Sequence, residues 1–508
     1  MPTPDNRIEP PISDKIFTVE QETVLDEELS TQEIKKRSVT GVMALISRTF
    51  VIQIISFVST LALTIFLDPN TYGIFYLVSS VVNFLAYFSD IGLAAALIQK
   101  KEKISKEDLS TTFTIQQILV ISLVTLLFVL SPFIRTQYKI APEGIFLLYA
   151  MGISFFLSSL KTIPSILLER DIQFKKLIIP QILETLVFNG VAVYAAWKGL
   201  GVNAFSYAVL SRGIVGLIAM YIIYPWKPTY GIHKESLKTL LKFGLPYQIN
   251  TFLAVLKDDG MTIVLTRIIG TEGLGYIGWA SKWAGLPLRI LMDNLTKVSF
   301  PTFSRLQNDK DRLVRAVEIN IKYLSLAAFP IFIGMAFMAA PMINILPRYT
   351  KWMPAIIPLY IYLYSSAWAG ISTSLTNLMN AVGHIKITFR LMIMWTILTW
   401  ATMPILSIKY GYLGVAYAVL IIATSSIVTV ILARKYVPFS LIRSLRSPVL
   451  SSVVLFLFLL SVKGLIGSLA SVIVISLVSV VIYSVMVILL EGKNFVKESL
   501  SILKVKNA

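Results

Sequence analysis

The chain of 508 residues contains no cysteine and only two histidines, His233 and His384. The lack of cysteine excludes disulfides, thiolate metal ligands and cysteine nucleophiles. Both histidines fall in predicted loops, and the sequence has no phosphate-binding loop, no G-x-S-x-G turn and no cluster with metal-ligand spacing. We therefore expect no metal site, no cofactor and no enzymatic activity.

Charged residues are also scarce. They make up 15% of the chain, whereas soluble proteins average about 25%. Hydrophobic residues make up 56% and recur in blocks of about 20, which is the length that crosses a hydrocarbon core about 30 Å thick. The sequence thus predicts an all-α integral membrane protein.

The first residues of the given sequence are not typical of a cleavable signal peptide. The first 34 residues are polar and acid-rich, without a basic start or an apolar run, so we do not expect a cleavable signal peptide. Residues 1–40 are predicted to form a disordered, acidic cytoplasmic tail. The net charge of +18 does not indicate nucleic-acid binding, because the basic residues lie in short connections where they meet anionic lipid headgroups.

We predict about fourteen membrane-spanning helices, with both termini in the cytoplasm. The predicted spans are 41–66, 71–97, 111–133, 143–167, 177–197, 203–224, 243–268, 273–298, 318–340, 354–376, 387–407, 411–432, 449–466 and 468–490. Lys and Arg gather in alternate connections, for example at 100–106 and 234–242, and this bias sets the orientation.

Two internal matches indicate that a six-helix unit is duplicated. Residues 67–77 resemble residues 269–279 at an offset of 202, and residues 201–210 resemble residues 411–420 at an offset of 210. An even number of spans inserts both copies the same way round, which predicts a parallel repeat with substrate between the halves. The predicted units are an N-terminal lobe at 41–235, a C-terminal lobe at 236–440, two additional helices at 441–492 and a basic cytoplasmic tail at 493–508.

The eighth predicted span carries the sharpest functional signal. On a helix, Lys282, Arg289 and Asp293 fall within about 20° of one another. A charge at membrane depth costs at least about 2.5–3.5 kcal/mol, so such residues normally face a bundle interior or a watery cavity. Arg289 could simply pair with Asp293, which leaves Lys282 as the first candidate for substrate contact. We place Arg289 second, with Asp293 holding the arginine in position.

The first and second spans extend this candidate site. Asn83 and Asp90 share a polar face of the second span, so Asn83 is a candidate cavity residue and Asp90 a candidate for gating. Arg48 stands near the cytoplasmic end of the first span, where it could bind substrate or merely extend its charge to the interface.

The fifth and seventh spans hold further candidates for gating or coupling. Lys257, Asp258 and Asp259 precede a glycine, which predicts a local helix break with either a satisfied ion pair or a gate. Glu184 is a carboxylate within an apolar span, and is either a proton carrier or the partner of Arg212 or another helix.

Together these residues predict a hydrated cavity with a cationic bias. Arg48, Lys282 and Arg289 suit an anionic group such as a diphosphate, because Arg grips its oxygens in pairs and Lys acts as a point charge. No soluble domain that could hydrolyse ATP interrupts the spans. The driving force is therefore expected to be a gradient of H⁺ or Na⁺, the membrane potential or the substrate gradient.

Four stretches of sequence resemble a known family. SVTGVMALISRTFVIQIISF and the residues after it (38–99) resemble the opening of Wzx-type polysaccharide flippases. LLERDIQFKKL (167–177), IGTEGLGYIGWASKWAGLPLR (269–289) and FPTFSRLQNDKDRL (300–313) are similar to later parts of the same proteins. These flippases are the polysaccharide-transporter branch of the multidrug/oligosaccharidyl-lipid/polysaccharide exporter superfamily.

The resemblance implies two six-helix lobes around a V-shaped central cavity, with two further helices. It implies alternating access that moves a polyprenyl-diphosphate-linked oligosaccharide across the cytoplasmic membrane, with membrane lipids and polysaccharide polymerase machinery as partners. Relatives that flip the peptidoglycan precursor use lumenal arginines, for which Arg48 and Arg289 are candidates by placement. The alternatives are a drug or small-cation antiporter, which would need an acidic cavity, and a glycan-assembly enzyme, which would need large outer loops.

Overall fold

The computed structural model describes residues 31–100 and 102–492, which form helices and short connections without a β-strand. The α-helices are α2 (Thr31–Phe66), α3 (Pro69–Ala86), α4 (Leu93–Gln99), α5 (Lys106–Tyr138), α6 (Pro142–Leu160), α7 (Thr162–Arg170), α8 (Phe174–Trp197), α9 (Asn203–Ile223), α10 (Lys234–Val255), α11 (Met261–Leu306), α12 (Lys310–Ile345), α13 (Ile356–Ala381), α14 (Ile385–Tyr410), α15 (Tyr412–Ser425), α16 (Ile427–Tyr436), α17 (Leu441–Ser461) and α18 (Leu469–Glu491). Four short helices are η1 (Tyr87–Ser89), the π-helix η2 (Leu256–Gly260), η3 (Thr350–Ala355) and η4 (Lys463–Leu465). The all-α prediction is confirmed for these residues.

Twelve helices of the described ranges are long and apolar enough to cross a membrane, so the chain is a multi-pass membrane protein. The predicted spans 243–268 and 273–298 are not among them. They fall on α10, η2 and α11, which carry the charged residues of the candidate site. The count of fourteen spans and the orientation of the termini therefore stay predictions.

Local chemistry fixes where several helices begin. Asp68 caps α3 by accepting the Thr71 N–H at 2.7 Å, and Pro69 occupies the first helical position. Ser105 and Asp108 form a reciprocal capping box at the start of α5. Helix α2 already begins at Thr31, ten residues before the predicted first span, while residues 1–30 and 493–508 of the two predicted tails lie outside the described residues.

Several predicted spans are interrupted, including the twelfth, which breaks at Ser426 between α15 and α16. The second breaks at Gly92, whose φ of 76° is favoured by glycine, and the fourth breaks at Lys161 between α6 and α7. The break predicted before Gly260 is present as the π-helix η2. Such single π-turns often occur at functional sites.

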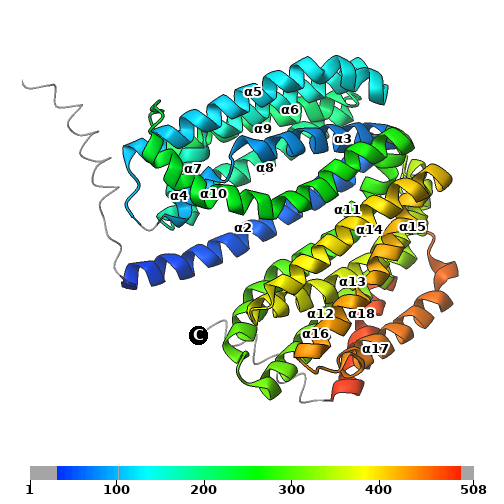
Figure 1. Ribbon diagram of the computed structural model, residues 1–508. Coiled ribbons are helices and arrows are strands. Elements are labelled where there is room, and N and C mark those ends of the chain that lie inside the picture. The colour runs from blue at the N-terminus through cyan, green and yellow to red at the C-terminus, as the bar shows by residue number, and fades with distance from the viewer. Residues whose placement is uncertain (1–30, 101, 493–508) are drawn as a thin grey trace, which may run out of the picture.

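The helices form two groups, as Figure 1 shows. The first group, α2 to α9 in blue to green-cyan, is held by contacts of α8 with α2 and α9 and of α6 with α3, α5 and α9. The second group comprises α11 to α16, and α17 and α18 pack on its helix α12. Helix α10 contacts α4 and α5 of the first group and α14 of the second. Where one lobe ends and the next begins in the sequence stays a prediction.

The two groups meet through two glycines that the offset of 202 places opposite each other. A Cβ on Gly73 of α3 would lie 1.6 Å from the Thr271 carbonyl oxygen, and one on Gly275 of α11 would lie 1.8 Å from the Pro69 carbonyl oxygen. The same offset pairs Pro69 with Thr271, so the two contacts are exchanged between the halves, as a local two-fold relation requires. This reciprocity is local to the two glycines, and the duplication of the whole six-helix unit stays a prediction.

The same end of the molecule is closed by polar contacts between the groups. The Thr64 hydroxyl lies 2.7 Å from the Tyr349 hydroxyl, and the Trp352 Nε1–H donates to the Thr64 carbonyl oxygen at 2.9 Å. Lys351 donates to the Ile65 carbonyl oxygen at 2.8 Å. We call this the joined end; the largest cluster of buried apolar side chains lies here and contains residues of both groups.

Candidate functional site: a cationic cavity between the helix groups

A cavity of about 1150 Å³ lies between the two groups. Its wall is built by α2, α3, α8 and α9 on one side and by η2, α11, α13, α14 and α15 on the other. Small-molecule pockets usually measure about 300–1,000 Å³, so this cavity has room for a large polar headgroup. No cluster of three or more potential metal ligands was found in the part of the chain that the structure describes.

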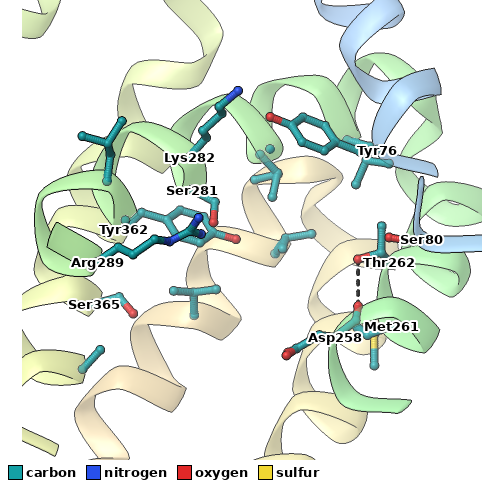
Figure 2. A pocket seen from close by; sticks show the side chains of 18 of the residues that line it. Tyr76, Ser80, Asp258, Met261, Thr262, Ser281, Lys282, Arg289, Tyr362 and Ser365 are labelled. Carbon is teal, nitrogen blue, oxygen red and sulfur yellow. Dashed lines mark hydrogen bonds between the residues drawn. The ribbon is translucent and has the colours of Figure 1, made fainter. Parts of the chain in front are cut away.

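Helix α11 places two of its basic residues in this cavity. Lys282 and Arg289 both line it, together with Ser281, and Figure 2 shows the three side chains on one wall. They are seven residues apart, which is two helical turns, so both face the same side. Gly278, one turn before Lys282, leaves room for the ring of Tyr76, because a Cβ there would lie 2.1 Å from the ring edge.

The expected pairing of Arg289 with Asp293 is wrong for this conformation. The structure contains no ion pair within 4 Å between these two described residues, and Asp293 is exposed outside the cavity lining. An i, i+4 pair on one helix gains only about 0.2–0.5 kcal/mol, which is too little to draw an arginine out of a cavity. Arg289 is therefore available to an anion.

The π-helix contributes one ion pair to the cavity and directs a second carboxylate elsewhere. Lys257 and Asp258 line the cavity and pair with each other, so the satisfied ion pair considered from the sequence is formed. Thr262 donates to the Asp258 carbonyl oxygen at 2.8 Å (Figure 2). Asp259 instead lies near the side chains of Ser80 and Asn83 of α3, and it is not part of the cavity lining. Asn83 thus contacts η2 and does not line the cavity.

The first helix group contributes a cation that sequence reasoning named only as a partner. Arg212 of α9 lines the cavity, with 54% of its side chain exposed, and its Nε lies 3.7 Å from Glu184 Oε2. Glu184 is 8% exposed and also pairs with Lys161 at the break between α6 and α7. Gly216 makes room for this carboxylate, because a Cβ there would lie 2.2 Å from Glu184 Oε1.

Glu184 thus forms the predicted ion pair with Arg212, which was one of the two alternatives considered for it, and Lys161 is an additional partner. The sequence offered a signal for both cations, since each stands within an apolar span and charges there are rare without a function. Lys161 escaped notice because the span was taken as one continuous helix, whereas the chain breaks there.

The remaining candidates lie outside the cavity lining. Arg48 is on α2, one turn before the first lining residue Ile52, and its Nε has no hydrogen-bond partner among the described residues. Asp90 accepts the Ala94 N–H at 3.1 Å and so caps the start of α4. The roles proposed for these residues in substrate binding or gating stay predictions.

The charges of the cavity are strongly unequal. Arg212, Lys257, Lys282 and Arg289 line it, and Asp258 is the acidic residue of its lining. Once Asp258 is set against Lys257, three cations remain, contributed by both helix groups. A low-dielectric cavity strengthens their attraction for an anion. The arrangement therefore suits a doubly or triply charged group that can touch both walls.

The chain is similar to proteins of known families. The family described as polysaccharide biosynthesis protein matches residues 62–357. The succinoglycan biosynthesis transport protein ExoT of Rhizobium meliloti is 23% identical over 58% of this chain and 59% of its own length. The lipopolysaccharide biosynthesis protein WzxC of Escherichia coli is 22% identical over 77% of this chain and 79% of its own.

A solved structure shows the same fold. A lipid II flippase, MurJ, in an inward closed conformation superposes with a TM-score of 0.70, covering 88% of this chain and 98% of that chain at 16% identity. The resemblance to polysaccharide flippases inferred from the sequence is thus confirmed at the level of family and fold. The chain spans little more than half the length of the first curated relatives it matches, 59% and 55%.

Proposed function

The chain belongs to the polysaccharide biosynthesis protein family, and on this premise we propose that it is a flippase for a polyprenyl-diphosphate-linked oligosaccharide. Arg212, Lys282 and Arg289 bind the diphosphate from opposite sides of the cavity. The observation that carries this proposal is the excess of cations in a large cavity between two helix groups. ExoT is named as a transport protein and MurJ as a flippase, which supports transport over catalysis.

The proposal includes a direction. Basic residues concentrate in the loops on the side away from the joined end, so we place that side in the cytoplasm and the joined end outside. The cavity then receives the headgroup from the cytoplasmic leaflet, and separation of the joined end releases it outward. Export of a cationic drug is disfavoured, because the excess of cations in the cavity lining would repel it.

Reconstitution tests the proposal. The protein is placed in vesicles with a polyprenyl-diphosphate oligosaccharide that carries a fluorophore, and an impermeant quencher reports how fast the label reaches the outside. We expect wild type to accelerate quenching, and Lys282→Ala and Arg289→Ala to slow it about tenfold or more each, since each removes a charge-assisted contact worth about 1.5–3 kcal/mol.

Matched controls lie on the same helix. Lys297 and Arg305 belong to α11 but do not line the cavity, so Lys297→Ala and Arg305→Ala should keep the wild-type rate. Wild-type vesicles that flip no labelled lipid but export a cationic dye would refute the proposed function. Equal rates in all four variants would refute the assignment of Lys282 and Arg289.

A further inference from the structure

Part of the cavity lining is aromatic and carries no charge. Aromatic side chains of the first helix group gather there, and we call them the aromatic wall: Tyr72, Phe75 and Tyr76 of α3, Phe188 of α8 and Phe205 of α9. Their rings contact one another, with Phe75 stacked on Phe205 at 4.2 Å between centroids and Tyr72 edge-on to Phe205 at 5.7 Å.

The aromatic wall and the cations occupy different depths of the cavity. Tyr72 and Tyr76 lie in the first two turns of α3, next to Gly73 at the joined end. On α11, Lys282 and Arg289 lie two and four turns beyond Gly275, which touches α3 at that end. On α9, Phe205 likewise precedes Arg212 by two turns. The cations therefore lie farther from the joined end than the rings, and Figure 2 shows Tyr76 facing the side on which Lys282 lies.

Polar groups border the rings. The Asn189 amide N–H donates to the Thr185 carbonyl oxygen at 2.8 Å, which leaves the amide oxygen as an acceptor at the cavity wall. The hydroxyls of Tyr72 and Tyr76 are buried and have no hydrogen-bond partner among the described residues. An unmet buried hydroxyl costs about 1–3 kcal/mol, so a ligand that supplies its partner gains that free energy on binding.

The half-buried rings of Phe75, Tyr76 and Phe188, edged by amide and hydroxyl groups, fit a carbohydrate. The negative face of an aromatic ring attracts the C–H groups on the apolar face of a pyranose, while the sugar hydroxyls need donors and acceptors around its rim. A lipid chain would contact the rings but would leave the polar groups without partners. A second phosphate would have no cation beside it at the aromatic wall. We infer that the aromatic wall is a subsite for the uncharged sugars next to the diphosphate.

This inference rests on the proposed function and adds to it the orientation of the bound headgroup in the cavity. The diphosphate lies at Arg212, Lys282 and Arg289, and the sugars extend from it toward the joined end. The headgroup thus enters the cavity with its sugars first. They are then the part nearest to the outside when the joined end separates.

Binding measurements with two lipids test the subsite. The purified full-length protein is titrated with bare polyprenyl diphosphate and with the same lipid carrying an uncharged oligosaccharide. Phe188→Leu removes a half-buried ring, and we expect it to raise the Kd for the glycosylated lipid about tenfold while changing the Kd for the bare lipid less than twofold. Tyr76→Phe removes only an oxygen without a partner, so it should fold normally and weaken the glycosylated lipid about threefold to tenfold.

Control variants distinguish failure of the sugar subsite from failure of the proposed function. Phe146 and Tyr207 contact each other on the outer surface of the same group and do not line the cavity, so Phe146→Leu and Tyr207→Phe should leave both constants unchanged. Lys282→Ala should weaken both lipids. If Phe188→Leu weakens both lipids equally, the rings hold the lipid chain and the inference is overturned; if it weakens neither, there is no sugar contact. If wild type binds neither lipid, the proposed function itself fails.

Discussion

Removing Glu184 from the first helix group should destabilise the protein strongly, because the carboxylate is the partner of Lys161, a half-buried lysine. Lys161 is 15% exposed on its side chain and Glu184 11%, so the two charges are largely withdrawn from water. Breaking such a pair costs about 3–5 kcal/mol, since it strands the remaining charge. Arg212 adds little to this figure, because it is 54% exposed and 3.7 Å away. We expect Glu184→Leu to lose about 3 kcal/mol.

The double variant distinguishes a structural pair from a proton carrier. Lys161→Met with Glu184→Leu replaces both charges by apolar groups, and such exchanges are often neutral or stabilising. Thermal unfolding of the purified protein should therefore give a midpoint several degrees below wild type for Glu184→Leu and one close to wild type for the double variant. The coupling between the two sites should be at least about 3 kcal/mol, because the double variant regains what Glu184→Leu alone loses.

Flux in the vesicle assay then tests the function of the carboxylate. If Glu184 acts only through its pairing, the double variant should flip the labelled lipid within about threefold of the wild-type rate. A stable double variant without flux would contradict this reasoning and favour the proton-carrier alternative. A Glu184→Leu variant as stable as wild type would show that the pair contributes nothing to folding.

Two further predictions concern contacts between helices. Gly275→Ala should push α3 away from α11 at the joined end, at a cost of about 1–3 kcal/mol. A single cysteine introduced at the buried Thr60 should then react faster with an impermeant maleimide. Gly285→Ala is the control, because a Cβ at that position has no atom within 4 Å. Arg170→Ala should lower the unfolding midpoint, because Arg170 donates to the carbonyl oxygens of Leu97 at 2.8 Å and Lys100 at 2.6 Å, whereas the exposed neighbour Lys175 should tolerate alanine.

Hydropathy and helical spacing were sufficient to predict the class of fold and the most important wall of the cavity. Apolar blocks must become helices in a membrane, because lipid offers no partner for backbone polar groups. The spacing of Lys282 and Arg289 places them on one side of any helix, and both line the cavity. These inferences depend on local periodicity alone, which the tertiary structure does not alter.

The rest depended on contacts between distant segments. Arg212 and Glu184 lie on successive helices, but only the packing of α8 against α9 shows that they meet while Arg212 also reaches the cavity. Asp90 was grouped with Asn83 by helical phase, yet the chain breaks at Gly92 and turns Asp90 into a cap for α4. The aromatic wall escaped notice because apolar rings on a membrane helix are expected whether they face lipid or a cavity.

The placement of the cations on both helix groups suggests how binding can be linked to movement. Under the proposed function, Arg212 on one group and Lys282 and Arg289 on the other repel each other while the cavity holds no anion. At a separation of about 10 Å and an effective dielectric constant of about 20, each such pair opposes approach by roughly 1.7 kcal/mol. A diphosphate between them reverses the sign of the interaction. A ligand can shift a conformational equilibrium only by its differential affinity for the two states, and contact with both groups provides such a difference. Neutralising Arg212 alone should therefore reduce the effect of the ligand on the approach of the two helix groups more than it reduces the affinity for the ligand. The reason is that the two cations of α11 still bind the headgroup.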